Sequence, residues 1–314
     1  MKCLKKCMKI LAALLLAACI PSVSAAQEKA FLTDSLSGQA VTVKEAAEHL
    51  QYFDVTVMGE FHDSHAVHQM ELEMLTELYR LHGTNLVLSM EMFERDVQPV
   101  LDAYLAGRIT EAELMRKARP WPNYPTDYRP MVEFAKAHHI PVLAGNIPRP
   151  LAALYARTGT LESVPDSQKQ WLPAFTSAPE GAYKEKFKDM MKQVGHEGMA
   201  GVSLQADRMY QAQCLKDDVM AESMTLWMLR HPRSYIFHIQ GEFHGAGRLG
   251  SVQKLQERMP EKQIALITPL QGEQRLMMTG RSAAAGQEAD YFIMLPEEKG
   301  SHPAGSTAPS AARP

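Results

Sequence analysis

Apolar residues in this chain fall into short uninterrupted runs, and the segments between them carry apolar residues at helical spacing. Runs of four to eight apolar or β-branched residues bounded by turn residues are typical of buried strands. After the first run, Val67, Met70 and Met74 recur at three- and four-residue spacing, as on one face of a helix. Strands that alternate with helices predict an α/β fold with a mostly parallel β-sheet flanked by helices. The runs lie at residues 55–58, 86–93, 141–146, 235–239, 264–267 and 291–295, and the last is expected to form an antiparallel edge strand.

Two segments are too long to be simple crossovers between parallel strands. Residues 95–130 and 150–230 exceed the usual length of such a connection and contain helical patterns, notably from Arg208 to Leu229. We therefore expect them to form a small all-helical lobe at the carboxyl edge of the sheet.

The N-terminal residues 1–25 have the pattern of an export signal. A lysine-rich region precedes the apolar stretch Ile10 to Ala18, which is too short to be a permanent membrane span. Two processing sites compete: Val23-Ser24-Ala25 fits ordinary signal cleavage, and Leu16-Ala17-Ala18-Cys19 resembles a bacterial lipobox, in which the cysteine is lipidated. The position of Cys19 at the end of the apolar run favours the lipobox. We expect an exported lipoprotein on the periplasmic face of a Gram-negative membrane.

Composition limits the remaining possibilities. The net charge of -3 gives no general attraction for nucleic acid, so no nucleic-acid partner is expected. Cys214 is the one cysteine after the signal, which excludes an intramolecular disulfide and a cysteine-type zinc site in the folded part. We expect a spacer at 26–44, the α/β domain at 45–296, and a disordered tail rich in proline and small residues at 297–314.

The tetrapeptide Gly-Glu-Phe-His occurs twice, as Gly59-Glu60-Phe61-His62 and as Gly241-Glu242-Phe243-His244. Each copy ends a predicted strand, and in parallel sheets the carboxyl ends of the strands build the binding crevice. Converging carboxylates and imidazoles suit acid–base chemistry or a divalent metal. The candidate residues at strand ends are Glu60, His62, Glu91, Asn146, Glu242 and His244.

His65 and His68 extend this polar group if a helix begins near residue 64. The alternative is that the glutamates cap helices and the histidines are satisfied polar residues in tight loops. For any one residue that alternative is the stronger, but the duplicated tetrapeptide together with Glu91 favours a functional site.

These motifs, in this order with the export signal, resemble the erythromycin esterase/ChaN-like superfamily, whose TraB/TIKI relatives also carry paired Gly-x-x-His motifs. The likeness is greatest to the ChaN-type haem-binding lipoproteins of bacterial iron uptake. It covers about residues 45–295, and the segments 121–149 and 211–221 strengthen it.

The resemblance implies a dimer that holds two stacked haems, with each iron bound by a tyrosine of one subunit and the propionates met by histidine and lysine of the other. Tyrosine suits ferric iron as a hard oxygen ligand. We favour Tyr183, which lies beside Lys184 with His196 further along. Tyr210 is a second candidate on a more apolar helix face, and Tyr124 and Tyr128 also remain open.

Two hypotheses about function follow. The first is a haem carrier or store rather than an enzyme, with haem, a second copy of the chain, a membrane and an uptake receptor or transporter as partners. The second is a metal-dependent or acid–base hydrolase in which His62 or His244 activates water with help from Glu60 or Glu91. The glutamate–histidine group by itself favours the hydrolase; the export signal and the likeness over the helical lobe favour the carrier.

Overall fold

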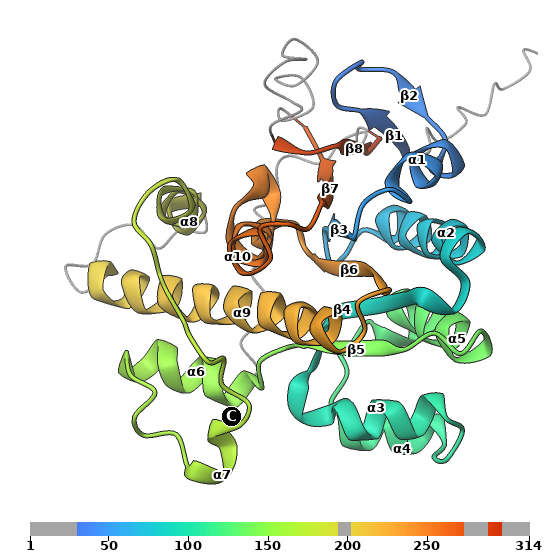
Figure 1. Ribbon diagram of the computed structural model, residues 1–314. Helices are drawn as coiled ribbons and strands as arrows, with labels where there is room; N and C mark the ends of the chain where they lie inside the picture. Colours follow the sequence, from blue (N-terminus) through green and yellow to red (C-terminus); the bar gives the residue numbers. More distant parts are fainter. Residues whose placement is uncertain (1–29, 194–201, 273–287, 297–314) are drawn as a thin grey trace, which may run out of the picture.

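The computed structural model describes residues 30–193, 202–272 and 288–296, which form a β-sheet flanked by helices (Figure 1). The strands are β1 (Phe31–Asp34), β2 (Ala40–Val41), β3 (Val55–Glu60), β4 (Leu86–Glu94), β5 (Val142–Asn146), β6 (Tyr235–Gly241), β7 (Ile264–Leu270) and β8 (Tyr291–Met294). The α-helices are α1 (Val43–Leu50), α2 (His65–His82), α3 (Gln98–Leu105), α4 (Glu111–Ala118), α5 (Arg129–Ala137), α6 (Arg149–Thr158), α7 (Asp166–Lys169), α8 (Ala182–Gln193), α9 (Val202–Arg230) and α10 (Gly250–Arg258). Short 3-10 turns lie at η1 (Gly83–Asn85), η2 (Arg95–Val97), η4 (Glu242–His244) and η5 (Ala246–Arg248), and a π-helical turn, η3, at Tyr124–Tyr128.

The strand order is β2-β1-β8-β7-β3-β6-β4-β5. The six strands from β8 to β5 pair in parallel, and β1 pairs antiparallel with both β8 and β2. The predicted α/β class with a mostly parallel sheet is therefore confirmed. The sheet places β3 and β6 at its centre, each with a neighbour on both sides.

Two expectations about the edge of the sheet are wrong. The last strand, β8, is parallel to β7 and is no edge, because β1 covers its other side. That covering strand comes from residues 26–44, which were expected to be a spacer. Leu32 of β1 is 1% exposed and packs in the main core, so burial of an apolar side chain holds this segment on the sheet.

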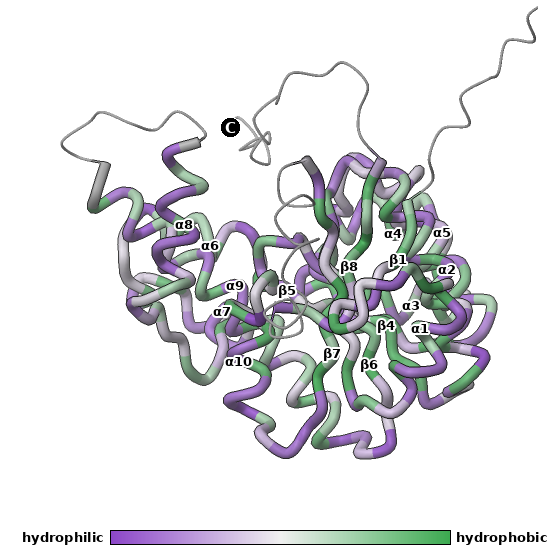
Figure 2. The backbone as a smooth tube through the Cα atoms, turned by 90° about the horizontal axis from the view of Figure 1, so that it is seen from above, coloured by the Kyte–Doolittle hydropathy of each residue, from purple (hydrophilic) through white to green (hydrophobic). Residues whose placement is uncertain are grey.

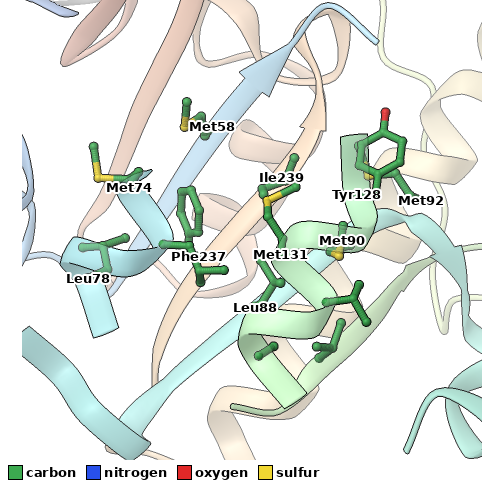
Figure 3. Packing of buried hydrophobic residues seen from close by; sticks show 14 of the residues in the cluster. Met58, Met74, Leu78, Leu88, Met90, Met92, Tyr128, Met131, Phe237 and Ile239 are labelled. Carbon is green, nitrogen blue, oxygen red and sulfur yellow. The ribbon is translucent and has the colours of Figure 1, made fainter. Parts of the chain in front are cut away.

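The side chains of the central strands alternate between two cores, one on each face of the sheet. Met58, Phe237 and Ile239 point to the face covered by α2 and α5, where they lie among Met74 and Met131 (Figure 3). Their neighbours along the strands point to the opposite face, where α9 and α10 cover them; these are Val55, Val57, Ile236 and Leu266. Figure 2 shows the strands as hydrophobic segments between helices whose outer positions are polar. Burial on both faces explains why the strands have apolar runs rather than alternating patterns.

The long helix α9 links the sheet to a helical lobe (Figure 1). Its C-terminal half packs on the sheet through Ala221 and Met224, and its N-terminal half packs against α6 and α8. The expected helix from Arg208 to Leu229 lies within it. The earlier insertion supplies α3 and α4, which lie beside β5 and the end of β4.

Among the residues that the structure describes, no helix is both long and apolar enough to cross a membrane. The export signal with Cys19, the tail at 297–314 and His196 lie outside the described residues.

The pairing of β1 with β8 predicts different effects for two leucines of the segment 26–44. Replacing Leu32 by alanine should lower the free energy of unfolding by about 2–4 kcal/mol, because it leaves a cavity in the core. Leu36→Ala, at a residue that is 69% exposed, should change it by less than about 0.5 kcal/mol. Urea unfolding of both variants checks this, and equal small effects would contradict the docking of β1.

Candidate functional site

The pairing of β3 with β6 brings the two tetrapeptides together. The strands are parallel and in register, with Gly59 opposite Gln240 and Glu60 opposite Gly241. Strand β4 pairs with the other side of β6 and carries Glu91. The expectation that both copies lie at one edge of one sheet is confirmed.

The glycines of the tetrapeptides allow a close approach that a side chain would prevent. A Cβ atom on Gly241 would lie 2.8 Å from Cε1 of His62, and one on Gly59 would lie 3.1 Å from Cα of Glu242. The imidazole of His62 thus lies directly on the backbone of the second copy. Trp121 packs against this ring in a T-shaped arrangement, with centroids 4.8 Å apart.

His244 of the second tetrapeptide forms a buried ion-pair cluster with Glu91 of β4 and Asp217 of α9. We call these three residues the His244 cluster. Nδ1 of His244 lies 2.5 Å from Oδ1 of Asp217, and Nε2 lies 3.2 Å from Oε1 of Glu91. The other oxygen of Glu91 accepts a hydrogen bond of 2.7 Å from the backbone N–H of Gly241. All three side chains are at most 7% exposed.

These contacts move the pKa values of the His244 cluster apart. Burial opposes the charge on His244, but Glu91 and Asp217 outweigh it and raise the pKa of the imidazole to about 9. Burial likewise opposes ionisation of Glu91, yet His244, with help from His62 and Lys216, holds the pKa of that carboxyl well below its usual range. At neutral pH the cluster therefore contains an imidazolium at His244 and a carboxylate at Glu91.

The first tetrapeptide forms a separate group around Glu60. Oε1 of Glu60 lies 2.6 Å from Nδ1 of His62 and accepts a 2.6 Å hydrogen bond from the hydroxyl of Tyr128. Burial and the neighbouring Glu71 raise the pKa of Glu60 to about 8. Burial lowers the pKa of His62, but Glu60 and Glu91 more than offset this, so the net shift is upward. Figure 3 shows the hydroxyl of Tyr128 directed away from the apolar core.

Tyr183, the favoured haem ligand, connects to the His244 cluster through Asp217. Its hydroxyl donates a 2.8 Å hydrogen bond to Oδ2 of Asp217, whose other oxygen contacts His244. The residue is 3% exposed and packs against Tyr210 and Phe243. Burial and Asp217 raise the pKa of the phenol well above its ordinary value.

Tyr210 and Lys184, which were also proposed for haem, lie close to Tyr183 on the helical lobe. Tyr210 is 2% exposed, and its hydroxyl donates to the backbone oxygen of Pro179 at 2.6 Å. Lys184 forms ion pairs with Glu180 at 2.7 Å and with Asp207 at 3.0 Å.

The remaining strand-end candidates do not all join one site. Glu242 pairs with Lys186 at 3.3 Å, on the side of the lobe. Asn146 lies at the end of β5, which β4 separates from β6, and it bonds the backbone of Ile147. His65 is largely exposed at the start of α2, whereas His68, one turn further on, is buried beside Glu60.

Sequence reasoning assigned no role to Asp217, Gln213 or Glu71. Asp217 and Gln213 lie on α9 in the segment 211–221, and the amide nitrogen of Gln213 lies within 3.2 Å of both ring nitrogens of His244. Asp217 is an acidic residue in the middle of a helix that the sequence predicts to be buried, and this position could have marked it as a functional residue. Glu71 follows His68 by three residues, a spacing that places both on one face of a helix.

The fold and the site together define an α/β protein with two acid–imidazole groups at the carboxyl ends of adjacent parallel strands. A sequence model of the family described as "Haem-binding uptake, Tiki superfamily, ChaN" matches residues 46–255, and the chain belongs to this family. No curated protein sequence matches it.

Two solved structures share the fold. The structure titled "Cofacial heme binding to ChaN of Campylobacter jejuni" superposes with a TM-score of 0.65 at 16% sequence identity and covers 86% of this chain and 98% of that one. A mutant of the erythromycin esterase EreC in its open conformation superposes with a TM-score of 0.51 at 13% identity, with the same coverage.

The pKa shifts of the His244 cluster predict how stability depends on pH. His244 has its pKa raised from 6.5 to about 9, so the stabilisation from its charge is complete below pH 6.5 and is lost as the pH rises through 9. The lowered pKa of Glu91 adds stabilisation above 4.5 that is lost as the pH falls.

His244→Gln should therefore lower the free energy of unfolding most near pH 6, by about 3 kcal/mol, because it leaves two buried carboxylates without their counter-charge. The deficit should shrink above pH 9. His231→Gln, at an exposed histidine, is the control and should have little effect at any pH. Denaturant unfolding from pH 5 to 10 measures both, and a deficit that does not change with pH would contradict the ion pair.

Proposed function

We propose that this protein binds ferric haem, with Tyr183 as the iron ligand, and that it acts as a carrier or store of haem in iron uptake. Membership of the haem-binding uptake family supports haem as the ligand. The observation that carries the choice of tyrosine is the chain of contacts from Tyr183 to Asp217 to His244.

Haem binding at Tyr183 would require its phenol to lose a proton, against the raised pKa that burial and Asp217 give it. When haem is bound, a tyrosinate oxygen supplies a hard anionic ligand to ferric iron. The carboxylate of Asp217 accepts a 2.8 Å hydrogen bond from the phenol, so a proton acceptor is in place when iron displaces the proton. His244 contacts the other oxygen of Asp217 and keeps that carboxylate in position.

The volume of the cavity beside Tyr183 limits where a porphyrin could bind. A cavity of about 80 Å³ adjoins this residue and is lined by Pro179, Gly250 and Lys254 among others. A ligand of drug size needs roughly 300 Å³ or more, so a porphyrin does not fit inside the lobe as it stands. Binding through Tyr183 therefore requires the segments that line this cavity to move apart, with the haem at the surface of the lobe.

A haem at the surface would leave one of its faces uncovered, and a second copy of the chain would cover it. We therefore propose a homodimer with haem at the interface, which agrees with the cofacial haem binding named for the Campylobacter jejuni protein. Lys184, close to Tyr183, and His196 are proposed to meet the propionates. The N-terminal sequence supports attachment to the periplasmic face of a membrane through a lipid on Cys19, where a receptor or transporter would exchange haem.

Spectral titration of the purified protein with ferric haem tests the ligand. The wild type should bind haem in stoichiometric amount with a high-spin tyrosinate spectrum, and Tyr183→Phe should lose that spectrum. Tyr210→Phe is the matched control, since it removes a buried hydroxyl from the same aromatic cluster. Asp217→Asn should weaken binding by roughly tenfold through its contact with the ligand. A tyrosinate spectrum that survives in Tyr183→Phe would reject this residue as the ligand.

A second candidate, hydrolysis, is supported by the contact between His62 and Glu60. The side chain of His62 is 36% exposed, and the carboxyl group of Glu60 lies 2.6 Å from its Nδ1, an arrangement that orients the imidazole as a general base. This candidate predicts ester hydrolysis that is lost in His62→Ala and retained in His65→Ala. Equal rates in both variants would exclude it.

A further inference from the structure

On the side of α2, three buried side chains form a group of which the proposed functions use only Glu60. We call Glu60, His68 and Glu71 the α2 cluster. One ligand atom of each lies within 4.8 Å of those of the other two. The side chains are at most 2% exposed.

The hydrogen bonds of His68 show which of its nitrogens faces the carboxylates. Nε2 lies 3.1 Å from the backbone oxygen of His62, which can only accept, so this nitrogen carries a proton. Nδ1 lies 3.0 Å from Oε2 of Glu71 and 3.6 Å from Oε2 of Glu60. In the neutral ring, Nδ1 therefore carries a lone pair, which points at two carboxyl groups.

The carboxylates of the α2 cluster have unused oxygens. Oε2 of Glu60 and Oε1 of Glu71 are buried and lack a hydrogen-bond partner within the described ranges. Both donors to Glu60, from His62 and Tyr128, reach its other oxygen. The next charged group, Asp127, has Oδ2 4.0 Å from Nε2 of His68 and adds further negative charge. Buried carboxylate oxygens are normally satisfied, so these two require either a proton or a cation.

We propose that Glu60, His68 and Glu71 bind a divalent first-row cation such as Zn²⁺ or Mn²⁺. One imidazole nitrogen and two carboxylates are ligands that such ions accept. Bonds of about 2.0–2.2 Å bring ligand atoms to within roughly 4.4 Å of each other, so the observed spacing needs a small contraction. The bond from Nε2 of His68 to the carbonyl of His62 is the kind that orients a metal-bound histidine.

A cation in the α2 cluster would also support the first tetrapeptide. One oxygen of Glu60 would bind the cation while the other contacts His62. His68 donates a hydrogen bond to the backbone carbonyl of His62. The α2 cluster therefore fixes both the carboxylate and the backbone on which the position of His62 depends. This role is independent of haem binding at Tyr183, which lies on the helical lobe.

Calorimetric titration of the haem-free, chelator-treated full chain with Zn²⁺ tests the proposal. The wild type should bind one Zn²⁺ per chain at the α2 cluster, with a rise in the midpoint of thermal unfolding. Glu71→Gln keeps the shape of the side chain and should lose both effects. Glu73→Gln, at an exposed position of the same helix, is the matched control and should behave as wild type.

The competing arrangement is a proton shared between Glu60 and Glu71. Burial raises the pKa of both carboxyl groups to about 8, with Glu71 adding to the shift of Glu60 and Asp127 to that of Glu71, and this favours a shared proton when no cation is bound. Wild-type protein without saturable Zn²⁺ binding, or Glu71→Gln with undiminished binding, would overturn the proposal. His68→Gln is the second variant if Glu71→Gln does not fold. Haem titration of Glu71→Gln should match wild type, so failure of this proposal and failure of haem binding are distinguishable.

Discussion

The parallel pairing of β3 with β6 is the constraint on which the site depends. The hydrogen bonds of this pair set Glu60 opposite Gly241, so two tetrapeptides separated by about 180 residues lie side by side, offset by one residue. Each glycine then lets the other copy approach closely, His62 at Gly241 and Glu242 at Gly59. A shift of one residue in this register would point Glu60 to the opposite face of the sheet.

The site contains two groups of buried carboxyl side chains, and their negative charge is balanced in different ways. In the His244 cluster, an imidazolium lies between Glu91 and Asp217 and keeps Glu91 ionised inside the protein. In the α2 cluster, Glu60 and Glu71 lie close together without a fixed positive charge between them, so a proton or a cation must complete the group. Tyr183 adjoins the first group, which has a ready acceptor for the phenol proton.

Local patterns in the sequence were sufficient for the sheet, the repeated tetrapeptide and the importance of Glu91, because apolar runs and strand ends are short-range features. They were not sufficient for β1, whose four residues are held by a distant partner, β8, and carry little pattern of their own. The role of Asp217 was not predicted because its partners, Tyr183 and His244, come from separate elements. A helix pattern shows that Asp217 is on α9 but not which element packs over it.

The central claim is that Tyr183 binds the iron of haem while Asp217 accepts its proton. A crystal structure of the protein with ferric haem measures this directly. The expected result is iron bonded to Oη of Tyr183, with Asp217 still within hydrogen-bond distance of that oxygen. Iron bonded to a different residue, with Tyr183 still buried against Phe243 and hydrogen-bonded to Asp217, would contradict it.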